Sequence, residues 1–197
     1  MLAESSTPAD PSMPAGSTAG AHPLPRGARV GIDVGTVRIG VAASDPDGLV
    51  ATPVRTVARS VSTVPTDLAE IAGIVAERDA RVVYVGLPRH LSGSESSASG
   101  AVRAYCGALA HMVAPVPVRL VDERLSTVTA HQALYASGRS GRRHREVVDQ
   151  AAAVVILQSA IDAEHVTGGR VGEQVLPDGG TGPARPARRD DGHRGRD

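Results

Sequence analysis

GIDVGTVRIGVAASD, residues 31–45, places an acidic residue at the end of an apolar run and follows it with glycines and an arginine. Apolar residues fill most of the gaps in this pattern, and Gly35 and Gly40 interrupt it. The pattern therefore predicts two short strands, over residues 29–34 and 39–44, that are joined by a tight turn. Asp33 ends the first strand, a position from which acidic side chains usually hold metal or phosphate.

Two further acidic positions lie far along the chain. Asp122 and Glu123 follow the apolar run 116–121, and Asp149 lies near the start of a helical pattern. Two strand ends with carboxylates suggest one shared site. Asp149 alone is also explained as an acid that stabilises a helix N-terminus, by about 0.3–1 kcal/mol. Together, carboxylates from two strand ends and a helix start match a hard-cation site for Mg²⁺ or Mn²⁺.

The composition limits which partners the chain can bind. Its 197 residues suggest one domain, and a hydrophobic content of 41% is enough for a core. Trp and Phe are absent, so stacking of bases on aromatic side chains is largely excluded. Every basic residue is Arg and the formal net charge is zero. Contact with nucleic acid would therefore depend on a local basic surface.

The chain also lacks features of secreted and membrane proteins. Its single cysteine, Cys106, rules out an intramolecular disulfide. No apolar run approaches the ~20 residues that span a membrane, and the N-terminus has no basic start followed by an apolar stretch. We therefore expect a cytoplasmic protein.

The periodicity predicts one folded unit, residues 28–164, between a disordered arm (1–27) and a disordered tail (165–197) that are rich in small and polar residues. A third strand, 49–58, follows the first two, and helices and strands then alternate. The expected elements are a helix around 68–75, a strand at 81–86, a helix around 102–109, a strand at 117–121, a helix at 129–136, a loop at 138–145 and a helix at 146–163. This order predicts an α/β fold with a mixed five-stranded sheet and helices on both faces.

Four stretches in this order resemble the YqgF/RuvX family, whose members are bacterial proteins described as pre-16S rRNA nucleases or Holliday-junction-resolvase-like proteins. They are residues 31–45, 85–88 with 93–94, 122–127 with Ala130, and 149–152 with 157–158. The resemblance covers nearly the whole folded unit and implies a ribonuclease-H-like fold. It also implies a nuclease that uses two divalent cations, with Asp33, Glu123 and Asp149 as catalytic residues and metal ligands. Asp122 is the alternative to Glu123, because successive strand residues point to opposite faces.

Four arginines are candidates for binding the phosphates of a substrate. Arg38 and Arg124 each stand close to a proposed ligand, and either a phosphate contact or a structural ion pair explains them equally well. Arg142 and Arg143 belong to the basic loop that precedes Asp149, which could contact a nucleic-acid backbone or be an ordinary solvated loop.

The sequence leaves several alternatives open. Many ribonuclease-H-like nucleases carry an acid at the end of the fourth strand, where this chain has Gly86, so a non-catalytic RNA-binding assembly factor is one alternative. The turn after Asp33 also resembles that of actin-like ATPases, which need a second such domain. By resemblance, precursor rRNA is favoured over branched DNA as the substrate, and a junction resolvase would need two active sites and hence a homodimer.

Overall fold

The computed structural model describes residues 24–60, 65–89, 97–122, 142–177 and 181–182, with the backbone alone for 142–148. A seven-stranded sheet has the order β3-β2-β1-β4-β5-β6-β7. The strands are β1 (Arg29–Val34), β2 (Arg38–Ser44), β3 (Ala51–Ala58), β4 (Val82–Leu87), β5 (Val118–Asp122), β6 (Glu173–Val175) and β7 (Thr181–Gly182), and the helices are α1 (Thr66–Glu77), α2 (Ser97–Val113) and α4 (Arg142–Thr167). The pairs β1–β4 and β4–β5 are parallel and the others antiparallel, so the sheet is mixed, as predicted.

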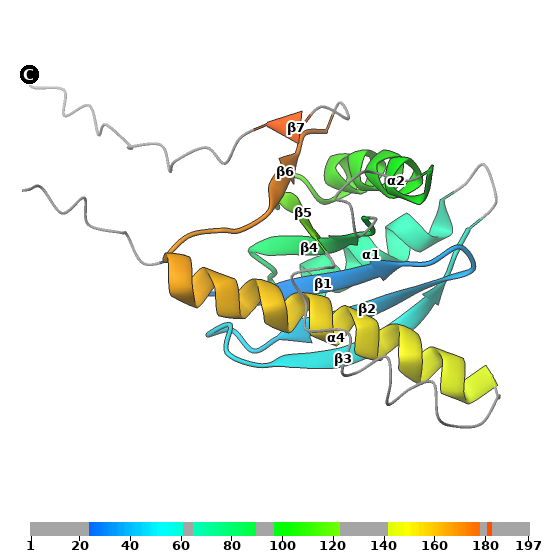
Figure 1. Ribbon diagram of the computed structural model, residues 1–197, viewed down its shortest axis with the longest axis horizontal. Coiled ribbons are helices and arrows are strands. Elements are labelled where there is room, and N and C mark those ends of the chain that lie inside the picture. The colour runs from blue at the N-terminus through cyan, green and yellow to red at the C-terminus, as the bar shows by residue number, and fades with distance from the viewer. Residues whose placement is uncertain (1–23, 61–64, 90–96, 123–141, 178–180, 183–197) are drawn as a thin grey trace, which may run out of the picture.

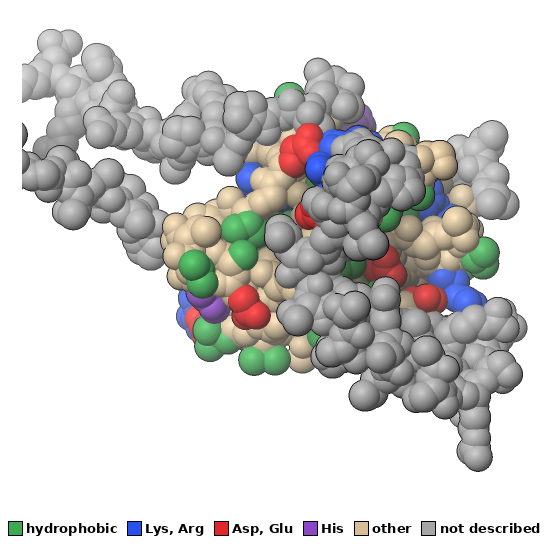
Figure 2. Space-filling model, viewed as in Figure 1, with side chains coloured by type: hydrophobic (Ala, Val, Ile, Leu, Met, Phe, Trp, Pro, Cys, Tyr) green, Lys and Arg blue, Asp and Glu red, His purple; other side chains and the backbone are tan. Residues whose placement is uncertain are grey.

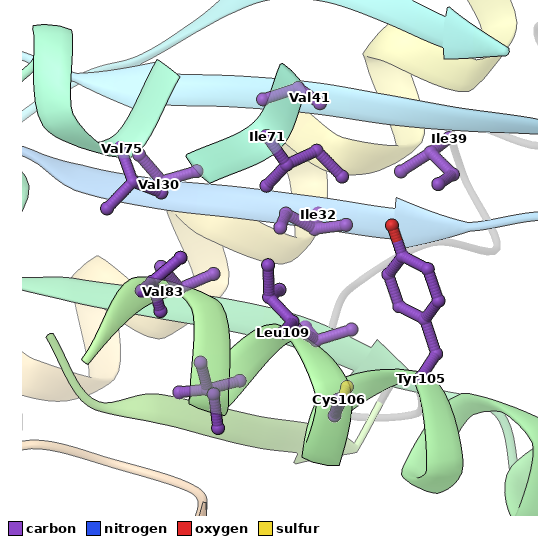
Figure 3. Packing of buried hydrophobic residues seen from close by; sticks show 14 of the residues in the cluster. Val30, Ile32, Ile39, Val41, Ile71, Val75, Val83, Tyr105, Cys106 and Leu109 are labelled. Carbon is purple, nitrogen blue, oxygen red and sulfur yellow. The ribbon is translucent and has the colours of Figure 1, made fainter. Parts of the chain in front are cut away.

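Helices cover both faces of the sheet (Figure 1). The long helix α4 crosses β1, β2 and β3 on one face. On the other face, α1 and α2 close over the larger apolar cluster, which Figure 3 shows in detail. In β1, Val30 and Ile32 belong to that larger cluster. Because strand residues alternate between the faces, Arg29, Gly31 and Asp33 point toward α4.

The sheet has two strands more than the sequence predicted. β6 pairs with the outer edge of β5, and β7 pairs with β6. Residues 165–177, which the sequence assigned to the disordered tail, include the end of α4 and β6, so the prediction was wrong for them. Val175 is buried, and the Arg119 Nη2 group donates to the carbonyl of Gly172 at 2.6 Å. These contacts with β5 hold a segment that has little apolar pattern of its own.

The last helix begins earlier than predicted. The sequence favoured a loop over 138–145, but α4 starts at Arg142 and therefore contains Arg142 and Arg143. Arginine is a good helix former, so a cluster of arginines does not by itself indicate a loop. The predicted helix at 129–136 lies outside the described residues. None of the described helices combines the length and the apolar character of a membrane-spanning segment.

Candidate active site

Asp33 is positioned by the register of the first hairpin. It is the fifth residue of β1, and its Cα lies opposite that of Gly40 on β2. The Gly35 amide donates to the carbonyl of Arg38 at 2.9 Å, which closes a tight turn between the two strands. Asp33 precedes this turn and Arg38 follows it. The side chains of both residues therefore lie on the same face of the sheet, the face toward α4.

Two glycines let α4 lie unusually close to this face. A Cβ atom built on Gly40 would lie 1.9 Å from the backbone oxygen of Asp149, and one on Gly31 would lie 2.5 Å from the Cβ atom of Leu157. Any side chain at either position would separate helix and sheet. Since Gly40 is the cross-strand partner of Asp33, the close approach at Gly40 brings Asp149 next to Asp33.

The two carboxylates share one electrostatic environment. Arg38 donates from Nε to the Asp149 carboxylate at 2.9 Å, and about a quarter of each of these side chains is exposed. Burial, followed by the negative charge of Asp149, raises the pKa of Asp33 to about 6. Arg38 therefore compensates the negative charge of Asp149 only in part, and the remaining charge still disfavours the ionised form of Asp33.

Two glutamines fasten α4 to the edge strand beyond the site. Gln150, the neighbour of Asp149, donates from Nε2 to the Thr56 hydroxyl at 3.2 Å. Two turns further on, Gln158 accepts from the Ala51 amide at 2.9 Å and donates to the Leu49 carbonyl at 3.1 Å. These anchors were not predicted from the sequence, although a polar residue at helical spacing on the sheet-facing side of a helix is a signal that the sequence contains.

Asp122 lies on the other face of the sheet. Val118 and Leu120, which share its alternation in β5, belong to the cluster under α1 and α2. The Arg89 Nε atom lies 3.8 Å from the Asp122 carboxylate. Asp122, the last residue of β5, therefore lies on the face opposite to Asp33.

The other predicted site residues are not placed by the structure. Glu123 and Arg124 lie outside the described residues, and for Arg142 and Arg143 only the helical backbone is described. Of the predicted residues, the structure thus brings together Asp33, Asp149 and Arg38. Within the described ranges, no group of three or more His, Cys, Asp or Glu residues could hold a metal ion.

The chemistry of the two carboxylates suits a divalent cation. Carboxylate oxygens are the preferred ligands of Mg²⁺ and Mn²⁺. Asp33 is disfavoured as an anion by burial and by the charge of Asp149, and a bound cation would offset both effects. The donors present therefore fit such an ion, which needs further oxygen ligands from elsewhere.

The mixed sheet with strand order β3-β2-β1-β4-β5 and helices on both faces has the architecture of ribonuclease-H-like proteins, as the resemblance implied. The RuvX family, described as Holliday junction resolvase, matches residues 27–163, and the chain belongs to this family.

The chain is also similar to curated proteins named "Putative pre-16S rRNA nuclease". It is 55% identical to the Nocardioides sp. protein over 76% of this chain and 96% of the relative. It is 52% identical to the Streptomyces coelicolor protein, over 76% and 89%. Among solved structures, RuvC of Thermus thermophilus matches at a TM-score of 0.46 and 14% identity, over 73% of this chain and 98% of that one.

Proposed function

We propose that this protein is a divalent-metal-dependent nuclease that hydrolyses phosphodiester bonds in structured RNA, and that it processes the 5′ end of pre-16S rRNA. The observation that carries the proposal is the meeting of Asp33 and Asp149 over Gly40, in a chain whose relatives are named as pre-16S rRNA nucleases. A catalytic acid on the first strand and another on the helix across it supply the oxygen donors that such chemistry requires.

We assign Asp33, Asp149 and Glu123 as catalytic residues and as ligands of Mg²⁺ or Mn²⁺. The alternation along β5 supports Glu123 over Asp122. Val121, which precedes Glu123 by two positions, packs against the cluster under α4, whereas Asp122 starts on the opposite face. A third carboxylate also suits the charge balance, because two divalent cations carry four positive charges.

Divalent cations in this site would offset the negative charge that develops on the phosphate and on its leaving oxygen during hydrolysis. The protein contributes the placement of the groups. The close contact of α4 with Gly40 fixes the backbone of Asp149, and Arg38 holds its carboxylate. With a pKa of about 6, Asp33 is mainly ionised above neutral pH and becomes protonated in acid.

Arg38, Arg124, Arg142 and Arg143 are proposed to bind substrate phosphates. Arg38 uses Nε for Asp149, and the two Nη groups of the same guanidinium carry four further N–H donors for a phosphate. On the face that Figure 2 shows, arginine side chains lie beside acidic ones. Most arginines whose side chains the structure describes form ion pairs, for example Arg55 with Glu70. This supports assigning the main backbone contact to the arginine-rich segment before Asp149.

Branched DNA is the second candidate substrate, because the family that matches the chain is described as Holliday junction resolvase. Resolution of a junction requires two cuts and thus two sites, so this role needs a homodimer. A monomer in light scattering at assay concentration would favour RNA processing. Discrimination between RNA and DNA would depend on groove shape and contacts to the 2′-hydroxyl.

The test is cleavage of labelled pre-16S rRNA and of a four-way DNA junction, each with Mg²⁺, Mn²⁺ or EDTA. Wild type is compared with Asp33→Asn and Asp149→Asn, which keep the side-chain shape and remove a ligand charge. Asp162→Asn is the matched control, because Asp162 is an exposed acid on the same helix as Asp149 and bonds Gln158.

Cleavage that requires a divalent cation, is lost in both site variants and persists in Asp162→Asn supports the proposal. The substrate that is cut identifies the role. Binding of precursor rRNA without cleavage under any of these conditions would overturn the catalytic assignment and favour an assembly factor. Equal cleavage by wild type and Asp33→Asn would remove Asp33 from the site.

A further inference from the structure

Arg59, the first residue after β3, holds the turn between β1 and β2 from outside the site. Its amide donates to the Val37 carbonyl at 2.9 Å, and its Nη1 group donates to the Gly35 carbonyl at 3.2 Å. The backbone and the side chain of one residue thus bond both ends of the turn segment 35–37. Asp33 and Arg38 flank this turn.

The guanidinium of Arg59 is itself fixed by two helices. Its Nε atom lies 3.5 Å from the carboxylate of Asp67, whose side chain is 2% exposed. The other Asp67 oxygen accepts the Leu68 amide at 2.9 Å, which anchors the carboxylate to the start of α1. On α2, the ring of Tyr105 lies 4.3 Å below the guanidinium, a cation–π distance.

The position of Tyr105 places this arrangement at the site end of the sheet. Figure 3 shows Tyr105 reaching from α2 toward the carboxyl-terminal end of β1, beyond Ile32 and near Ile39. Arg59, Asp67 and Tyr105, here termed the turn clamp, therefore connect the helices of the far face with the turn that follows Asp33. The clamp and α4 act on opposite faces of the same two strands.

We propose that Arg59 is a positioning residue: through the turn clamp it fixes the β1–β2 turn and so holds Asp33 and Arg38 in the geometry that metal and substrate require. This inference rests on the proposed function for its metal and substrate. Arg59 acts through the two turn carbonyls and through no reacting atom. Residues that orient metal ligands from outside typically change metal affinity or activity by about 10–100-fold when mutated.

The experiment uses Arg59→Lys, Arg59→Gln and a matched pair, Arg55→Lys and Arg55→Gln. Arg55 also links β3 to α1, through an exposed ion pair with Glu70 at 3.1 Å, and it has no bond to the turn among those described. Three quantities are measured on the full chain: amide exchange of residues 35–37 in EDTA, the Mg²⁺ concentration that half-saturates the rise in melting temperature, and kcat and KM for cleavage.

We expect faster amide exchange in the turn for both Arg59 variants, because neither lysine nor glutamine has the guanidinium group that reaches Gly35 and Asp67 together. The half-saturating Mg²⁺ concentration should rise about tenfold, and kcat should fall with a smaller change in KM. Arg55 variants should match wild type in all three. If Arg59→Gln does not fold, Arg59→Lys decides.

Unchanged turn exchange in the Arg59 variants would overturn the clamp. Faster exchange with wild-type Mg²⁺ dependence and kcat would make Arg59 merely structural and overturn the positioning role. Failure of the proposed function is seen separately, because the wild type itself would then show neither stabilisation by Mg²⁺ nor cleavage.

Discussion

Replacing Gly40 with alanine would push a methyl group into the backbone of α4. The added Cβ atom would lie 1.9 Å from the Asp149 oxygen and 2.5 Å from its carbonyl carbon. Both are main-chain atoms, so no side-chain rotation relieves the overlap. The helix or the strand must therefore move, and the helix residue at the overlap is Asp149, a proposed metal ligand.

The size of the movement follows from the contact distance. An ordinary contact begins at 3.4 Å, so the helix must withdraw by about 1.5 Å at this point. Overpacking of this kind typically costs about 1–3 kcal/mol in the free energy of unfolding. A displacement of about 1 Å in reacting groups can cost about 100-fold in rate. We therefore expect Gly40→Ala to lose both stability and about two orders of magnitude in cleavage per folded molecule.

Urea denaturation and cleavage at a temperature where the variants remain folded measure the two losses. Gly31→Ala is the matched control, because it strains the same helix at Leu157 and at the carbonyl of Ala153, eight and four residues from Asp149. It should lose comparable stability and much less cleavage. Gly73→Ala, where nothing lies within 4 Å, should gain up to about 1 kcal/mol because alanine favours a helix. A Gly40→Ala variant that is destabilised but cleaves at the wild-type rate would refute the argument.

Three further outcomes are expected. Glu164→Ala should lower the free energy of unfolding in urea by about 3–5 kcal/mol, because Glu164 pairs with buried Arg29 at 3.1 Å. The folded variant should cleave normally, since Glu164 lies about 22 Å along α4 from Asp149; impaired cleavage would contradict this. The pKa of Asp33 is raised to about 6 from 3.8, so in EDTA the stability of the wild type relative to Asp33→Asn should fall as pH rises through this interval. Asp33→Asn should be the more stable by about 1–3 kcal/mol above pH 7, and a stability difference that does not change with pH would refute the buried charge. Glu123→Gln should abolish metal-dependent cleavage while Asp122→Asn retains most of it, and equal losses would reject the alternation argument.

Local patterns predicted the part of the fold that local interactions determine. Alternation in residues 29–44 predicted β1 and β2, and hence that Asp33 ends a strand. The three-residue strand β6 could not be predicted this way, because its pairing depends on the open edge of β5 and on Arg119, which bonds the segment before it. Short strands that are held by a distant partner carry no periodicity of their own.

The sequence predicted the candidate acids but not the residues that support them. Asp33 and Asp149 were predicted from residue type and resemblance, and the structure places them close together. The sequence does not show that Gly40 lies between them, although a glycine inside a strand often marks a close backbone approach. Arg59 follows a strand in no recognisable motif, and its partners Asp67 and Tyr105 come from two helices that only the fold brings together.

Gly40 and Arg59 control the same hairpin from opposite faces, and this makes their effects interdependent. Gly40 determines how near α4 brings Asp149, and Arg59 determines how firmly the turn holds Asp33. If both act on the geometry of one carboxylate pair, the loss of cleavage in Gly40→Ala combined with Arg59→Lys should be smaller than the product of the single losses, since a geometry already lost cannot be lost again. Losses that multiply would mean that each residue supports a separate feature of the site.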